Sequence, residues 1–102
     1  MRVTLLYFRH CPNWLTAASN LQQALDIDQL GASTIDFVEV TTLEQAEALH
    51  FPGSPTIFVD DRDLFAEQAG PPGLACRLYS SGGGLVGAPT IEQIMAALTR
   101  VG

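Results

Sequence analysis

The chain of 102 residues contains no lysine and only two cysteines, Cys11 and Cys76. The absence of lysine excludes Schiff-base chemistry and removes the lysine of phosphate-binding loops. Eleven acidic residues against five arginines give a formal net charge of −6. A negative charge disfavours nucleic acid and anionic membrane surfaces as partners. We therefore expect neither a nucleic-acid-binding nor a membrane-binding protein.

Long apolar runs are also missing. The run near the N-terminus covers only residues 3–8, which is too short for a signal peptide or a membrane span. Two cysteines 65 positions apart are too few for a disulfide scaffold and lack zinc-ligand spacing, so we expect no metal site. The length fits a single domain over residues 1–102. We expect it in the cytoplasm, where thiols are catalytic, redox-active or simply buried.

Cys11 stands where a strand-like pattern changes to a helix-like one. Pro12 is favoured in the first turn of a helix, so we place Cys11 at the N-cap. An apolar stripe at helical spacing follows, made of Trp14, Leu15, Ala18, Leu21 and Leu25. Unpaired N–H groups and the helix dipole favour an anion at this end, which predicts a reactive Cys11 thiolate. The alternative is a small buried hydrophobe; Pro12 after the cysteine and Arg9 and His10 before it favour the reactive interpretation.

Three further strands are predicted after this helix, which we expect to end at Gly31. Residues 34–40 are rich in β-branched and aromatic side chains and alternate only partly, as in a strand covered on both faces. Strand, helix and strand would form a βαβ unit with a parallel pair. Residues 56–59 and 63–65 predict an antiparallel hairpin.

Two capping boxes predict the remaining helices. Thr41 and Glu44 would open a short helix, and Thr90 and Gln93 would open the last one. Between the hairpin and the last helix, residues 70–87 are rich in Gly, Pro and Ser. A connection of this length in a compact domain is usually disordered or part of a binding site.

The predicted order is βαβαββα, with C-P-N-W at the first helix start and S-P-T before the third strand. In this arrangement the chain resembles the thioredoxin superfamily over nearly its whole length. C-P-N-W is similar to the glutaredoxin motif Cys-Pro-x-Cys with Trp14 in place of the second cysteine, and S-P-T is similar to the cis-proline segment. The resemblance implies an α/β fold, a central mixed sheet flanked by helices, with a long Gly/Pro-rich insertion at about residues 66–89. Residues 51–79 also resemble small thioredoxin-like proteins sometimes labelled as related to organomercurial lyases.

The resemblance implies roles for several residues. The Ser54–Pro55 bond would be cis and lie across from Cys11, leaving the Ser54 N–H and C=O free to pair with an extended substrate. Pro12, Trp14, Ser54 and Pro55 would form the substrate-binding surface.

The departure from the family lies at Trp14, which cannot resolve a mixed disulfide. Either an external thiol such as glutathione releases the substrate from Cys11, or Cys76 is the resolving thiol, because the insertion would border the active-site groove. Cys76 is alternatively a buried filler beside Leu74 and Leu78. Arg77 could attract an acidic substrate or lower the pKa of a thiol, but we expect it to be solvated.

We therefore predict a thiol-disulfide oxidoreductase that acts on mixed disulfides through Cys11, with Cys76 or an external thiol as resolving group. No cofactor is expected beyond a low-molecular-weight thiol as co-substrate, and the partners would be thiols or disulfides, proteins included. Two alternatives stay open: soft-metal or organomercurial handling by Cys11 and Cys76, and a binding module without redox chemistry. The sequence carries no prediction of oligomeric state.

Overall fold

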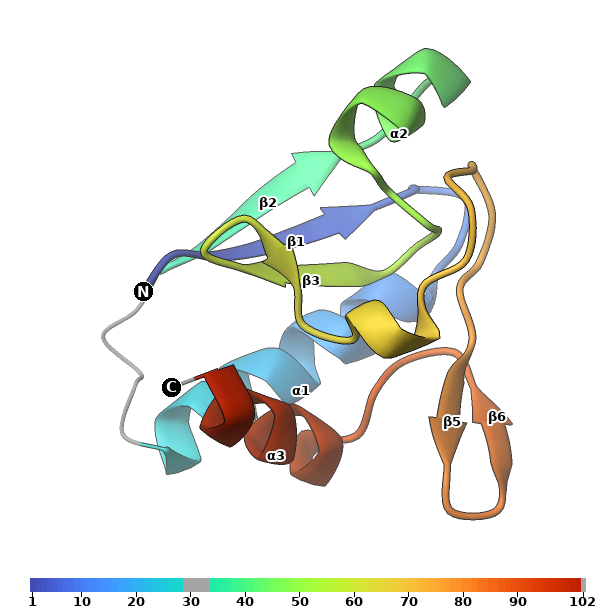
Figure 1. Ribbon diagram of the computed structural model, residues 1–102. Helices are drawn as coiled ribbons and strands as arrows, with labels where there is room; N and C mark the ends of the chain where they lie inside the picture. The colour runs from blue at the N-terminus through green and yellow to red at the C-terminus, as the bar shows by residue number, and fades with distance from the viewer. Residues whose placement is uncertain (29–33, 102) are drawn as a thin grey trace.

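The first predicted strand, β1, lies inside the sheet, with neighbours on both sides. The structure is a computed structural model that describes residues 1–28 and 34–101. Its elements in chain order are β1 (Val3–Tyr7), α1 (Asn13–Ile27), β2 (Ile35–Glu39), α2 (Leu43–Leu49), β3 (Thr56–Val59), β4 (Arg62–Asp63), the short 3-10 helix η1 (Ala66–Gln68), β5 (Tyr79–Ser81), β6 (Gly84–Val86) and α3 (Ile91–Val101) (Figure 1).

Four strands form a mixed sheet in the order β2-β1-β3-β4. β1 pairs in parallel with β2, Leu5 opposite Phe37, and antiparallel with β3, Leu5 opposite Ile57. β3 and β4 form the predicted antiparallel hairpin, whose turn residues Asp60 and Asp61 both have positive φ. The chain is therefore a mixed α/β protein, and the predicted βαβ unit and hairpin are confirmed.

Helices cover the two faces of this sheet unequally. α1 and α3 pack on one face and α2 lies on the other (Figure 1). The larger core lies between the sheet and the helix pair; its members include Leu5, Leu21, Ile57, Ile94 and Leu98. The smaller core, under α2, contains Leu6, Val40, Ala46 and Phe51. Successive residues of β1, Leu5 and Leu6, thus contribute to opposite cores, as the two-residue period of a strand requires.

The prediction that the second strand is covered on both faces is only partly correct: Ile35 packs on the larger core and Val38 on the smaller one. β2 is an edge strand, and Phe37 at its centre is 51% exposed. The faces of β2 are covered less completely than those of the inner strand β1, because the packed helices extend less far over the edge of the sheet than over its centre.

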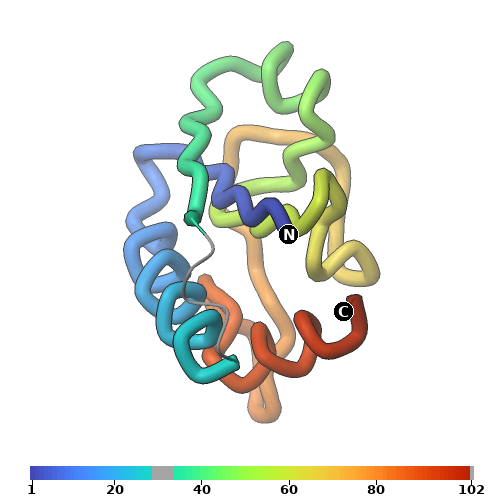
Figure 2. The backbone as a smooth tube through the Cα atoms, turned by 90° about the vertical axis from the view of Figure 1, so that its left-hand side faces the viewer, coloured from blue at the N-terminus to red at the C-terminus, as the bar shows by residue number. Residues whose placement is uncertain are grey.

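The predicted Gly/Pro-rich insertion is more ordered than expected. It contains η1 and an antiparallel hairpin formed by β5 and β6, which projects from the body of the protein near α3 (Figures 1 and 2). Ser80 fixes its base, because the Ser80 N–H donates to Gln68 Oε1 at 2.8 Å and the Ser80 carbonyl accepts from Gln93 Nε2.

The capping boxes were predicted with mixed success. At α3, Thr90 and Gln93 exchange side-chain-to-backbone hydrogen bonds as predicted. At α2 the box lies one residue later, because Thr42 accepts from the Gln45 N–H and Gln45 accepts from the Thr41 N–H.

The predicted burial of the apolar stripe of α1 is confirmed at Leu21 and Leu25, which are buried. It is wrong at Leu15, which is 59% exposed. The proposed helix end at Gly31 lies outside the described residues. Among the residues that the structure describes, no helix combines the length and the apolar character needed to cross a membrane.

Candidate functional site

A disulfide joins the two cysteines of the chain. The Cα atoms of Cys11 and Cys76 lie 5.6 Å apart across 65 positions of sequence. Cys76 is exposed, as is Leu78, so the alternative of Cys76 as a buried filler was wrong. Cys11, in contrast, is only 1% exposed. The structure thus brings together a buried and an exposed sulfur-bearing residue.

Cys11 lies in the turn between β1 and α1, where its N–H donates to the Phe8 carbonyl at 3.0 Å. The helix begins at Asn13 with Pro12 as its N-cap, so the prediction of Cys11 as N-cap was one residue early. The first turn of α1 has no acidic residue and no side-chain cap, which leaves its N–H groups beside the sulfur uncapped by side chains. Asn13 Nδ2 also lies 3.7 Å from Cys11 Sγ, as a weak donor to it. These groups favour negative charge on the sulfur after reduction.

Ser54 connects the second cysteine to the sheet. The Ser54–Pro55 bond is cis, and the Ser54 carbonyl oxygen lies 3.6 Å from Cys11 Sγ. The Ser54 N–H donates to the Ala75 carbonyl at 2.8 Å, and the Ser54 carbonyl accepts from the Arg77 N–H at 2.8 Å, so that Ser54 and Cys76 form an isolated parallel bridge. The backbone groups that were expected to be free for a substrate are thus occupied by the chain's own residues 75–77.

Gly53 gives this segment room to approach. Its φ is +123°, and a Cβ built there would lie 3.0 Å from the Ala75 carbonyl oxygen and 3.1 Å from Arg77 Cβ. A side chain at this position would therefore collide with the segment and strain the backbone.

Arg77 anchors the segment in the protein interior. It is 4% exposed; its guanidinium donates to Asp63 Oδ2 at 2.8 Å, to the Phe65 carbonyl at 2.7 Å and to Thr56 Oγ1 at 3.1 Å. The expectation of a solvated arginine was wrong, because β3, β4 and the following turn supply a carboxylate and two oxygen acceptors to a buried guanidinium.

Tyr79 continues this buried network. Its hydroxyl donates to the Pro55 carbonyl, and the Arg77 guanidinium lies 4.7 Å from the centroid of its ring. Burial raises the pKa of Tyr79 far above its usual value, against a smaller opposing effect of Arg77. Residues 77 and 79 thus point inward while 76 and 78 are exposed, the alternation of an extended segment.

The arginines next to the cysteines are both paired with carboxylates. Arg77 pairs with Asp63, and Arg9 donates two hydrogen bonds of 3.1 Å to Glu39, which lower the pKa of Glu39. Stabilisation of a Cys11 thiolate therefore comes mainly from the helix start and Asn13, and less from a free cationic side chain.

Trp14, in the first turn of α1, is part of an aromatic group. Its ring stacks on Tyr7 at 4.3 Å between centroids and meets Phe37 edge-on at 6.4 Å. Pro12 is exposed and Trp14 is half-buried. The group thus connects the start of α1 with β1 and β2.

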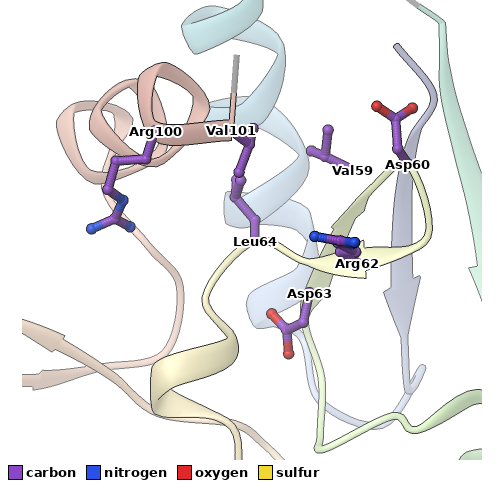
Figure 3. Close-up of a pocket in the computed structure, with 7 residues that line it drawn as sticks. All are labelled: Val59, Asp60, Arg62, Asp63, Leu64, Arg100 and Val101. Atoms are coloured by element: carbon purple, nitrogen blue, oxygen red, sulfur yellow. The ribbon is translucent and has the colours of Figure 1, made fainter.

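A cavity of about 560 Å³ lies elsewhere, at the end of β3 away from Ser54. It is lined by Val59, Asp60, Arg62, Asp63, Leu64, Arg100 and Val101 (Figure 3). Arg62 and Asp63 point to opposite sides of β4 in this view. Asp63 is bonded to Arg77 and Asp60 accepts from the Arg2 N–H, so both carboxylates already serve the fold. The cavity contains no sulfur and is separate from the disulfide.

Four residues hold Cys76 in place without having been predicted to do so from the sequence: Gly53, Asp63, Arg77 and Tyr79. The available signal was the two-residue alternation in C-R-L-Y, which indicates an extended segment even between glycines and prolines.

No group of three or more His, Cys, Asp or Glu side chains is placed to hold a metal ion within residues 1–28 and 34–101. No family model, curated protein or solved structure matches the chain.

Gly53→Ala should impair closure of the disulfide, because the added methyl group displaces residues 75–77. We expect a loss of about 1–3 kcal/mol in the free energy of unfolding, and a lower oxidised fraction at a fixed ratio of reduced to oxidised glutathione. Ser54→Ala is the matched control: the pairing uses only the backbone of Ser54, and its buried Oγ has no partner among the described residues. Equal oxidised fractions in the two variants would contradict the role assigned to Gly53.

Tyr79 should make the fold sensitive to alkali. The unfolded chain loses the tyrosine proton at about pH 10, whereas the folded chain retains it, so the stabilisation is complete below pH 10 and is lost above it. Above about pH 10, the free energy of unfolding should fall with pH by at most about 1.4 kcal/mol per pH unit. Urea denaturation of the oxidised protein between about pH 9 and 11 measures it. Tyr79→Phe should flatten the slope, and an unchanged slope in this variant would refute the assignment.

Proposed function

We propose that this chain is a thiol-disulfide oxidoreductase that cycles Cys11 and Cys76 between disulfide and dithiol. The observation that supports the proposal is the disulfide, which joins Cys11, buried in the turn between β1 and α1, to the exposed Cys76. The second redox group thus comes from the segment before β5 instead of from position 14. The missing second cysteine of the C-P-N-W motif is then no obstacle to two-electron chemistry.

We also propose that the fold is thioredoxin-like. The sheet order β2-β1-β3-β4, with β1 parallel to β2 and antiparallel to β3, supports this assignment. So do the placement of Cys11 at the start of α1 and the cis bond at Pro55 beside it. In such a fold Ser54 would normally bind the substrate backbone; here it would position Cys76.

The chemistry needs no cofactor beyond a thiol. A substrate dithiol gives two electrons and two protons to the Cys11–Cys76 disulfide, becomes a disulfide itself and leaves both cysteines as thiols. In the reverse direction the reduced pair would open a substrate disulfide. Glutathione or another small thiol would act as co-substrate, and Pro12 and Trp14 would contact a protein substrate. The proposed compartment remains the cytoplasm, where disulfides are usually catalytic or redox-sensing.

The segment that carries Cys76 is held by contacts that do not involve sulfur. Ser54 supplies two backbone bonds, Arg77 is anchored in the interior, and the Gly73 N–H donates to the Phe51 carbonyl at 3.0 Å. The two thiols would therefore stay close after reduction. Such positioning raises the effective concentration of one thiol at the other and speeds ring closure.

The proposal is tested by exchange between the oxidised protein and dithiothreitol, followed by separation of reduced and oxidised protein after acid quenching. We expect the reduced protein to transfer its electrons onward to glutathione disulfide and to return to the closed form. Cys11→Ser and Cys76→Ser should each abolish this two-electron turnover, because no intramolecular disulfide can form.

Ser54→Ala serves as the control, since it leaves both cysteines and the backbone pairing in place. The proposal fails if the wild-type protein does not return to the closed form, or if it turns over no faster than free dithiothreitol and glutathione react alone.

Soft-metal handling is the second candidate, favoured by the same proximity of two thiols. Thiolates prefer soft cations such as Hg(II). The reduced protein should bind one Hg(II) ion through both cysteines, and Cys76→Ser should weaken this binding about tenfold or more. Competition with a small thiol, followed by intact mass measurement, tests it; equal retention of Hg(II) by the variant would exclude a two-thiol site.

A further inference from the structure

We infer that Cys76, and not Cys11, is the sulfur that exchanges with an external thiol, and that Cys11 is the buried resolving and leaving group. The inference deepens the proposed function, on which it rests. It reverses the roles expected from the C-P-N-W motif, where the cysteine at the helix start would meet the substrate first.

Access is the first argument. An attacking thiolate approaches a disulfide along the line of the S–S bond, so the attacked sulfur must be reachable from outside. Cys11 is 1% exposed and its neighbour Ser54 is 0% exposed; the Ser54 carbonyl and the Asn13 amide already contact its sulfur. Cys76 is exposed; of its two outward neighbours along the segment, Leu78 is exposed and Leu74 is half-buried. An external nucleophile therefore reaches Cys76 more easily.

The leaving group is the second argument. Attack at Cys76 expels Cys11 as a thiolate, and a thiol of lower pKa leaves faster. The expelled sulfur lies at the start of α1, whose first turn is uncapped by side chains, and beside the Asn13 amide donor. Both groups stabilise negative charge and oppose the effects of burial and of the Ser54 carbonyl oxygen 3.6 Å away, which favour the neutral thiol. Attack at Cys11 would instead expel Cys76 as a thiolate. The guanidinium of the adjacent Arg77 points inward and pairs with Asp63, so it does not stabilise that thiolate.

The steps balance as two exchanges. An external thiolate bonds to Cys76 Sγ while the Cys11–Cys76 bond breaks, leaving a Cys11 thiolate that takes up a proton. A second external thiolate then attacks the sulfur bound to Cys76 and releases the external disulfide and a Cys76 thiol. In the reverse direction a substrate disulfide is opened by Cys76, and Cys11 then displaces the substrate from Cys76.

The positions of the arginines along the chain allow a direct test. Arginines are the only tryptic sites, and cleavage at Arg9, Arg62 and Arg77 places Cys11 on the peptide 10–62 and Cys76 on the peptide 63–77. The oxidised wild-type protein is mixed with glutathione, quenched with acid at successive times, treated with N-ethylmaleimide and digested. Mass spectrometry then locates glutathione on one peptide and maleimide on the other.

We expect glutathione on Cys76 and maleimide on Cys11, in about tenfold excess or more over the opposite pattern when extrapolated to zero time. Equal amounts, or an excess of glutathione on Cys11, would overturn the assignment. The total rate of opening tests the proposed function, whereas the division between the two peptides tests the order of attack and is readable even when opening is slow.

Single-cysteine variants give an independent measurement. With glutathione disulfide as the probe, Cys11→Ser should form its mixed disulfide at Cys76 about tenfold faster than Cys76→Ser forms one at Cys11. The reverse order of rates would also contradict the inference. Circular dichroism of both variants establishes that they are folded under the conditions of the assay.

Discussion

The pairing of the Ser54 backbone with residues 75–77 is the interaction on which the site depends. Two hydrogen bonds of 2.8 Å turn a Gly/Pro-rich connection into a short extended segment against the sheet. Alternation along that segment then places Cys76 outward over Cys11 and directs Arg77 into the interior. Gly53 permits the approach, since its missing side chain leaves the space that the segment fills. Without this pairing, the two sulfur atoms would have no fixed relation.

Burial of charge gives the segment its rigidity. A guanidinium removed from water is stable only when acceptors replace its hydration, and Asp63, Thr56 and the Phe65 carbonyl do so for the two terminal nitrogens of Arg77. Because those acceptors come from β3, β4 and the turn after them, movement of Cys76 would require breaking contacts with the sheet itself. The ion pair with Asp63 neutralises Arg77. The N-terminus of α1 therefore remains the principal source of positive potential beside Cys11.

Much of the fold follows from local patterns in the sequence, and the site follows only in part. The strand-to-helix change at Cys11, the hairpin at Asp60 and the Thr90 capping box could be predicted because each is encoded within a few residues. The exposure of β2 and the depth of Arg77 could not, because both depend on which strands become neighbours. The approach of Cys76 to Cys11 also depends on tertiary structure, since two cysteines separated by 65 positions carry no local signal of it.

The length of the loop closed by the disulfide links the redox state of the pair to the integrity of the whole domain. A crosslink across 65 residues restricts the unfolded chain by an entropy worth about 4 kcal/mol at room temperature in the loop-closure model. By thermodynamic linkage, the free energy by which the disulfide stabilises the fold equals the free energy by which folding stabilises the disulfide. Agents that loosen the domain, such as heat or urea, would thereby make the closed pair easier to reduce, and a reducing surrounding would leave the domain more susceptible to proteolysis.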